Sequence, residues 1–175
     1  SDVCSSDLAA LESTMDVKLI NPFLASVQNV FRTMVGTEVK VGKPYVKNDA
    51  TSTADISAVI GLSGDASGCV VLSFPEEVAC NAAGTFAGIA MTVDHPDFAD
   101  AVGELCNMVA GNAKKDLHGL NLGISLPSVI IGQKHVISQS KQEPRLVVPC
   151  ETKHGSFYLE VALRVEKPAM AGAGR

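Results

Sequence analysis

The chain has 175 residues, of which 46% are hydrophobic and 19% charged, a composition that fits one globular domain and excludes a disordered chain. Its net charge is −5 and no cluster of Lys and Arg is dense enough to bind a phosphate backbone, so nucleic-acid binding is not expected. The apolar runs are far shorter than a membrane span and residues 1–14 lack the pattern of a secretory signal, so we expect a cytoplasmic protein with no membrane segment.

The two ends of the chain differ in composition from what lies between them. Residues 1–14, SDVCSSDLAALEST, are Ser-rich and aperiodic, and Met15 fits a true start, so we interpret this segment as a non-native or disordered leader. Residues 15–167 are expected to form a single domain. Residues 168–175 are small and featureless, which is typical of a disordered tail.

The first part of the domain predicts one helix followed by three strands. Asn21 and Pro22 have the chemistry of a helix cap and first helical residue, and apolar residues then recur at helical spacing as far as Gly36. Alternating patterns predict strands in TEVKVGKPYVKN, ADISAVIGLSG and CVVLSF, with GDASG as the turn before the third.

Two further helices are expected in the middle of the chain. Ser73 and Glu76 have the spacing of a capping box, which predicts a helix over 74–87 that ends at Gly88. The segment VDHPDF then starts a long helix, expected over about 96–119.

The last part of the chain predicts strands and a closing hairpin. LGISLPSVIIG and HVISQS are strand-like, and TKHGS joins RLVVPCE to FYLEVALRVE. This element order lacks a βαβα alternation, so we expect an α+β fold with a largely antiparallel sheet and helices packed on one face. In the final strand one face is expected to be buried and carries Leu159, Val161, Leu163 and Val165, and the other face carries Tyr158, Glu160 and Arg164. This strand has no interior proline between Phe157 and Val165, and an unpaired edge there would favour a homodimer.

The long helix has an unusual exposed face. Its apolar residues fall within one arc: Phe98, Val102, Leu105, Val109 and Ala113. The opposite arc carries Asp100, Glu104, Asn107 and Gly111, with Lys114 and Lys115 at its flanks.

Such a face is often only a solvated surface, yet two features favour docking. Asn107 is a poor interior helix residue, and Gly111 should cost about 1 kcal/mol against Ala, with Gly103 adding a second such cost. Small residues beside polar ones allow another surface to approach closely. The pattern therefore indicates a docking face without naming its partner.

The stretch ELCNMVAGNA, which begins at Glu104, resembles the E-x-x-N signature of the CheC/CheX/FliY chemotaxis phosphatases, and Asp100 has the spacing of the acidic residue that precedes it there. NPF, VLSFPEE and LPSVIIG match the family around the three helices, so the resemblance covers about residues 16–166 and is closest to the CheX members. CheC members carry two such sites. In the other candidate helix here, PEEVACNAAG, Cys80 stands where the motif needs Asn, so one intact site is expected.

The resemblance implies a CheC/CheX-like fold and a phosphatase that removes the phosphoryl group from an aspartate of a phosphorylated CheY-like response regulator. Asn107 would orient the attacking water, and Glu104 would pair with the active-site lysine of the regulator. The residues expected to contact the regulator are Asp100, Gly103, Gly111, Lys114 and Lys115.

The same resemblance implies no cofactor of the chain's own, because the regulator supplies Mg²⁺. It also implies a homodimer joined through its sheets, with the Glu104–Asn107 face free in each subunit. The alternative is a non-enzymatic docking module of the FliM middle-domain type, which would bind a response regulator or a switch component. That domain lacks the catalytic pair, so the presence of Glu104 and Asn107 favours the enzyme.

Overall fold

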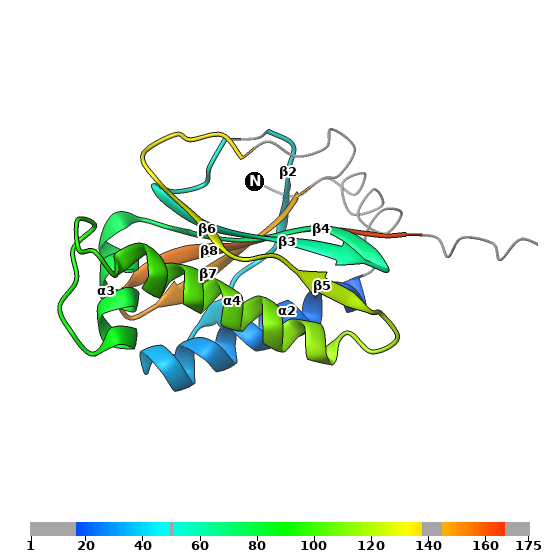
Figure 1. The fold of residues 1–175 in the computed structure, drawn as a ribbon, viewed down its shortest axis with the longest axis horizontal. Helices are drawn as coiled ribbons and strands as arrows, with labels where there is room; N and C mark the ends of the chain where they lie inside the picture. Colours follow the sequence, from blue (N-terminus) through cyan, green and yellow to red (C-terminus); the bar gives the residue numbers. More distant parts are fainter. Residues whose placement is uncertain (1–16, 50, 138–144, 167–175) are drawn as a thin grey trace, which may run out of the picture.

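The computed structural model describes residues 17–49, 51–137 and 145–166, so the predicted leader and tail lie outside the described residues. These residues form one antiparallel sheet with helices against one of its faces (Figure 1). The elements in chain order are α2 (Val17–Val30), the π-helical turn η1 (Phe31–Val35), β1 (Lys40–Val41), β2 (Tyr45–Lys47), β3 (Ile56–Gly64), β4 (Ala66–Phe74), α3 (Glu76–Ala87), α4 (Phe98–Asp116), β5 (Leu122–Ile124), β6 (Ser128–Ile131), β7 (Arg145–Thr152) and β8 (Gly155–Val165).

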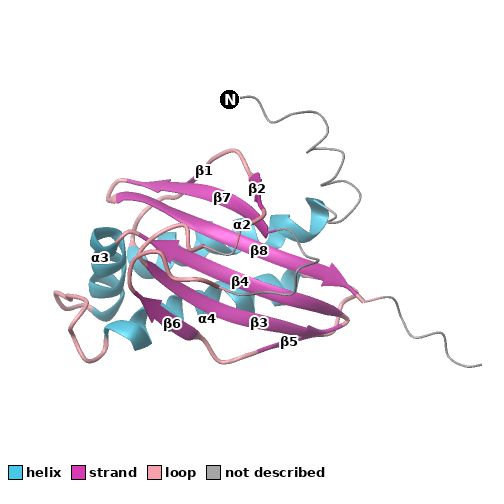
Figure 2. Ribbon diagram, turned by 90° about the horizontal axis from the view of Figure 1, so that it is seen from above, coloured by secondary structure: helices cyan, strands magenta, loops and turns pink. Residues whose placement is uncertain are grey.

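The predicted α+β fold is confirmed. The strand order is β1-β7-β8-β4-β3-β5, with β2 paired to β7 and β6 paired to β3, and every pairing is antiparallel (Figure 2). Helices α2, α3 and α4 lie together on one side of the sheet. Within the described part of the chain, no helix is long and apolar enough to cross a membrane.

The topology contains an internal repeat. A helix, a first strand broken into two short pieces, and a hairpin occur in the order α2, β1–β2, β3, β4 and again in the order α4, β5–β6, β7, β8. The hairpins meet through β4 and β8 at the centre of the sheet, and each broken strand crosses to pair with the hairpin of the other half. Helix α3 lies between the repeats, so α2 is the topological counterpart of α4.

The main core lies between the helices and the sheet. Phe31, Phe74 and Phe157 are all buried and stack there, with ring centroids 4.5 Å apart for Phe31 and Phe157 and 5.1 Å apart for Phe74 and Phe157. These rings come from η1, β4 and β8, so one aromatic cluster joins both halves of the repeat.

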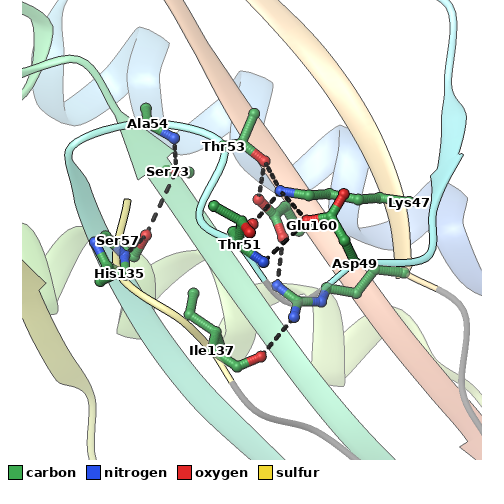
Figure 3. A network of polar contacts seen from close by, with 11 residues as sticks. Lys47, Asp49, Thr51, Thr53, Ala54, Ser57, Ser73, His135, Ile137 and Glu160 are labelled. Carbon is green, nitrogen blue, oxygen red and sulfur yellow. Dashed lines mark hydrogen bonds and ion pairs between the residues drawn. The ribbon is translucent and has the colours of Figure 1, made fainter. Parts of the chain in front are cut away.

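The opposite face of the sheet is covered by the chain around residues 51–55 and 132–137 (Figure 1). A buried ion pair joins Arg145 to Glu160 at 2.9 Å, and the same guanidinium donates a hydrogen bond to the carbonyl of Ile137 (Figure 3). The hydroxyl of Thr53 donates to the other carboxylate oxygen of Glu160. Polar contacts to two buried charges therefore hold these covering segments on the sheet.

Two predicted helix starts are wrong. Helix α2 is already formed at Val17, and Pro22 lies inside it, because Ile20 is buried in the core and extends the helical packing before Asn21. Ser73 is not a helix cap: it is buried in β4, where its hydroxyl accepts a hydrogen bond from the amide of Ala54.

The predicted helix ends are closer to the observed ones. Gly36 and Gly88 both have the left-handed conformation that ends a helix, with φ of 69° and 74°. Helix α4 runs over Phe98–Asp116, two residues inside its expected start and three inside its expected end.

The expectation of an unpaired edge on the final strand is wrong. Strand β8 lies between β7 and β4 and pairs with both, because the hairpin partner β7 lies beyond it in the sheet. The outer strands of the described sheet are β1 and β2 at one side and β5 and β6 at the other. Val165, expected on the buried face, is 46% exposed at the end of β8.

Candidate functional site

The site is built on α4, whose buried face is as predicted. Phe98, Val102, Leu105, Val109 and Ala113 all lie in the main core. Two further contacts fix the rotation of the helix: the buried hydroxyl of Ser26 on α2 donates to the carbonyl of Val109 at 2.7 Å, and the thiol of Cys106 lies 3.4 Å from the carbonyl of Ala58 on β3. The middle of α4 is therefore anchored on both sides of Asn107.

The opposite side of α4 presents side chains that nothing else in the described structure engages. Asp100 and Glu104 are exposed, and Asn107 and Gly111 are half-buried. Among the described residues, neither the carboxylates of Asp100 and Glu104 nor the amide of Asn107 has a hydrogen-bond or ion-pair partner. Residues three or four apart lie one turn apart on a helix, so these groups form one row about 16 Å long.

The two glycines of α4 have different surroundings. A Cβ added at Gly111 would meet no atom within 4 Å, so this turn is bare and open. The expectation that Gly103 is exposed is wrong: it is buried, and an added Cβ would lie 3.3 Å from Cγ of Pro127 and 3.5 Å from Val129. Gly103 therefore allows the chain's own β6 region to approach the helix.

This approach forms a groove beside Glu104 that the sequence did not predict. Its volume is about 320 Å³, and its lining residues are Ala99, Asp100, Gly103, Glu104, Pro127 and Val129. The Ser125 amide donates to the carbonyl of Gly61, and its hydroxyl accepts from the Gly61 amide, so the chain before Pro127 is held against β3. A helical-wheel argument considers one helix alone and so could not find this wall.

The two ends of α4 have opposite charge. Asp97 directly precedes the first residue of the helix and Asp100 lies in the first turn, whereas Lys114 and Lys115 lie in the last turn. Lys114 is half-buried and Lys115 is exposed, and neither has an ion-pair partner among the described residues. Each charge also complements the helix dipole at its own end.

The site lacks an activated nucleophile. Burial raises the pKa of the Cys106 thiol to about 12, so this neighbour of Asn107 stays protonated and points into the core. In the described ranges, no three His, Cys, Asp or Glu side chains are grouped so that they could hold a metal ion. What the face offers is a carboxylate and an amide, one turn apart.

The comparison of α4 with the PEEVACNAAG helix needs correction, because the repeat makes α2 rather than α3 the counterpart of α4. Residues 17–35 contain no Asp or Glu, so the counterpart helix has no carboxylate for a second E-x-x-N site. On α3, Glu77 is exposed and Cys80 is half-buried beside a separate hollow. The prediction of a single E-x-x-N motif is therefore consistent with the topology.

Comparisons with known proteins agree on one family. The family model described as chemotaxis phosphatase CheX matches residues 56–151. The chain is 31% identical over 123 residues to a Thermotoga maritima protein named CheY-P phosphatase CheX, covering 68% of this chain and 79% of that one.

Two solved structures have the same fold. The chemotaxis protein CheX from Desulfovibrio desulfuricans superposes with a TM-score of 0.78 at 33% identity, over 85% of this chain and 100% of that one. A CheX-CheY-BeF3-Mg²⁺ complex from Borrelia burgdorferi contains a chain that superposes with a TM-score of 0.71 at 26% identity, over 85% of this chain and 99% of that one.

Proposed function

The chain belongs to the CheX family of chemotaxis phosphatases, and we propose that it removes the phosphoryl group from the aspartate of a phosphorylated CheY-like response regulator. The name of the Thermotoga relative supports the activity, and the Borrelia complex supports a CheY-like partner. The observation that carries the proposal for this chain is the pair Glu104 and Asn107, which is unpartnered on a helix fixed from behind by Ser26. A cytoplasmic regulator as substrate makes the cytoplasm the expected location.

Asn107 is proposed to orient the attacking water. Phosphoryl transfer depends mainly on positioning and on stabilising charge, so a helper protein need not supply a nucleophile. The amide oxygen can accept a hydrogen bond from the water and so hold the water in line with the phosphorus. A carboxylate in the same place would be repelled by the phosphoryl oxygens.

Glu104 is proposed to pair with the active-site lysine of the regulator. Its carboxylate is exposed and has no partner within the described chain, so forming the pair would break no internal contact. Because Glu104 lies one turn before Asn107, this pair would fix the distance at which the amide enters the regulator's site. Asp100, Gly111, Lys114 and Lys115 would contact the regulator around this pair, and Gly103 would act indirectly by admitting Pro127.

The reaction also needs Mg²⁺, which we assign to the regulator. The Borrelia complex contains CheY, BeF3 and Mg²⁺ together with CheX. On this chain, Glu104 and Asp100 are two exposed carboxylates without a third ligand from the described residues. The chain's own contribution would be the amide, the carboxylate and the rigid helix that carries them.

The test is phosphate release from phosphorylated receiver domains, measured with and without the protein. Asn107→Ala should lower kcat by about 10²-fold or more, the scale for a misplaced reacting group, with folding intact. Asn112→Ala is the matched control, because Asn112 is also half-buried on α4 but lies off the row. Equal activity of the two variants would refute the role of Asn107.

The same assay distinguishes the proposed phosphatase from the alternative, a FliM-type docking module. Such a module would bind the regulator without accelerating phosphate release. Glu104→Ala should weaken binding to the regulator as well as the rate. If this variant bound as tightly as the wild type, the proposed lysine contact would be wrong.

We also propose a two-fold homodimer that leaves the Glu104–Asn107 face free in each subunit. The free edges of the described sheet, β1–β2 and β5–β6, offer unpaired backbone groups for such an assembly. Light scattering at micromolar concentration should give the mass of a dimer, and a monomer mass would refute it. Gly111→Cys should form subunit-to-subunit crosslinks only slowly, because rapid crosslinking would mean that the dimer covers the face.

A further inference from the structure

The groove beside Glu104 has two chemically different walls. On the helix side, Asp100 and Glu104 place two carboxylates at its rim, and Ala99 and Gly103 leave the space between them open. On the other side, Pro127 and Val129 form an apolar wall, and no residue from 120 to 131 is charged. The groove is thus acidic along one rim and apolar along the other.

This combination fits one kind of side chain. Lysine and arginine carry a charged head on a flexible hydrocarbon stem, so the stem can lie on apolar surface while the head reaches carboxylates. A purely apolar side chain would leave the carboxylate of Asp100 without a partner. An acidic side chain would be repelled.

We propose that this groove receives a lysine or arginine side chain of the response regulator, distinct from the regulator's active-site lysine, and so helps to select the partner and its orientation. The inference rests on the proposed function and extends it by one contact. Asp100 is the main acceptor, because Glu104 is already assigned to the active-site lysine. Charge complementarity and the apolar wall together define the occupant.

The position of this second cation on the regulator follows from helix geometry. Asp100 and Glu104 are four residues apart, which is about 6 Å along the axis of α4. The regulator should therefore carry a basic side chain about 6 Å from its active-site lysine, on the side away from the phosphoryl group. The unpaired Lys114 and Lys115 at the other end of the row would oppose a reversed docking of the same basic surface.

The experiment measures KM and kcat for phosphate release, and binding to the beryllofluoride-activated receiver domain. Asp100→Asn should raise KM about fivefold, and Asp100→Lys about tenfold or more because repulsion is added. In both variants kcat should stay near the wild-type value, because Asn107 is unchanged. The difference in KM between these variants and the wild type should become smaller at high salt, because salt screens the charges.

Two further variants separate the groove from general electrostatic attraction. Asp116→Lys makes the same charge change on the same helix but off the row, and it should leave KM within about twofold of wild type. Ala99→Phe fills the groove without changing charge and should also raise KM. Equal effects of Asp100→Lys and Asp116→Lys, or an unchanged KM in Ala99→Phe, would overturn the proposal.

A charge reversal identifies the partner residue. Each lysine and arginine on the contacting surface of the receiver domain is changed to Glu and assayed with Asp100→Lys. One of these changes should restore KM to near the wild-type value, and the absence of any rescue would overturn the proposal. If the wild-type protein fails to accelerate phosphate release, the proposed function itself fails, whereas normal wild-type activity with an unaffected Asp100→Lys refutes the groove alone.

Discussion

Replacing Gly111 by Ala should make the protein more stable and less active. Gly111 lies in the interior of α4, and an added Cβ would meet no atom within 4 Å. Ala is favoured over Gly in a helix interior by about 1 kcal/mol, chiefly because Ala has less conformational freedom than Gly in the unfolded chain and so loses less on folding. The free energy of unfolding should therefore rise by about 0.5–1 kcal/mol, which is a shift of about 1–4 °C in Tm for a domain of this size.

The activity of the same variant should change in the opposite direction. If the bare turn settles against the regulator, the new methyl group holds the helix away from it and displaces Asn107 from the reacting centre. A misplacement of about 1 Å costs about 10²-fold in rate. We therefore expect kcat/KM to fall between about tenfold and 10²-fold while Tm rises.

The measurements are thermal unfolding followed by circular dichroism and phosphate release from the phosphorylated regulator. Gly103→Ala is the matched control, since its Cβ would lie 3.3 Å from Pro127 and so should give a smaller gain in stability, or a loss. A stabilised Gly111→Ala with unchanged kcat/KM would show that no partner approaches this turn closely. A destabilised Gly111→Ala would contradict the open surroundings from which the argument begins.

Two further predictions concern buried groups that contribute to stability. Glu160→Ala leaves Arg145 buried without its carboxylate partner and should lower the free energy of unfolding, measured by urea titration, by about 3–5 kcal/mol. Replacing both residues by apolar ones should lower the free energy of unfolding by less, and equal losses in the two variants would contradict this. Burial raises the pKa of the Cys106 and Cys150 thiols from 9.0 to about 12, so these thiols ionise at lower pH in the unfolded chain than in the folded one. Their contribution to the free energy of unfolding is therefore complete below pH 9 and should be lost as the pH rises towards 12. Unfolding at pH 8 and pH 10.5 tests this, and the loss should be smaller in Cys106→Ala.

The sequence predicted the helix that carries the site because periodicity along one helix is a local property. The buried arc of α4 and the exposed position of Glu104 follow from spacing alone, whereas Asn107, predicted on the same exposed face, is half-buried. Gly103 was misplaced because its neighbours, Pro127 and Val129, come from a segment more than twenty residues later. A groove between two elements depends on how they pack, which one-dimensional spacing does not specify.

Other predictions failed where tertiary contacts outweighed a local motif. Ser73 and Glu76 have capping-box spacing, yet the side chain of Ser73 lies on the face of the sheet away from the helices, where its hydroxyl accepts a hydrogen bond from the amide of Ala54. Glu160 was assigned to the face opposite the core residues of the final strand, but its complete burial depends on Arg145, fifteen residues away. The position of β8 inside the sheet likewise follows from the crossing of the two halves.

The repeat explains why one helix carries the site and the other supports it. Helix α2 has the same topological place as α4 but carries no carboxylate, and its buried Ser26 donates to the carbonyl of Val109 on α4. Ser26→Ala should lower the free energy of unfolding by about 1 kcal/mol and also reduce kcat severalfold, because the turn after Asn107 loses an anchor. Ser73→Ala removes a buried hydroxyl on the far face and should leave kcat unchanged. If both variants had the same kcat as the wild type, Ser26 would serve stability alone and the supporting role of α2 would be wrong.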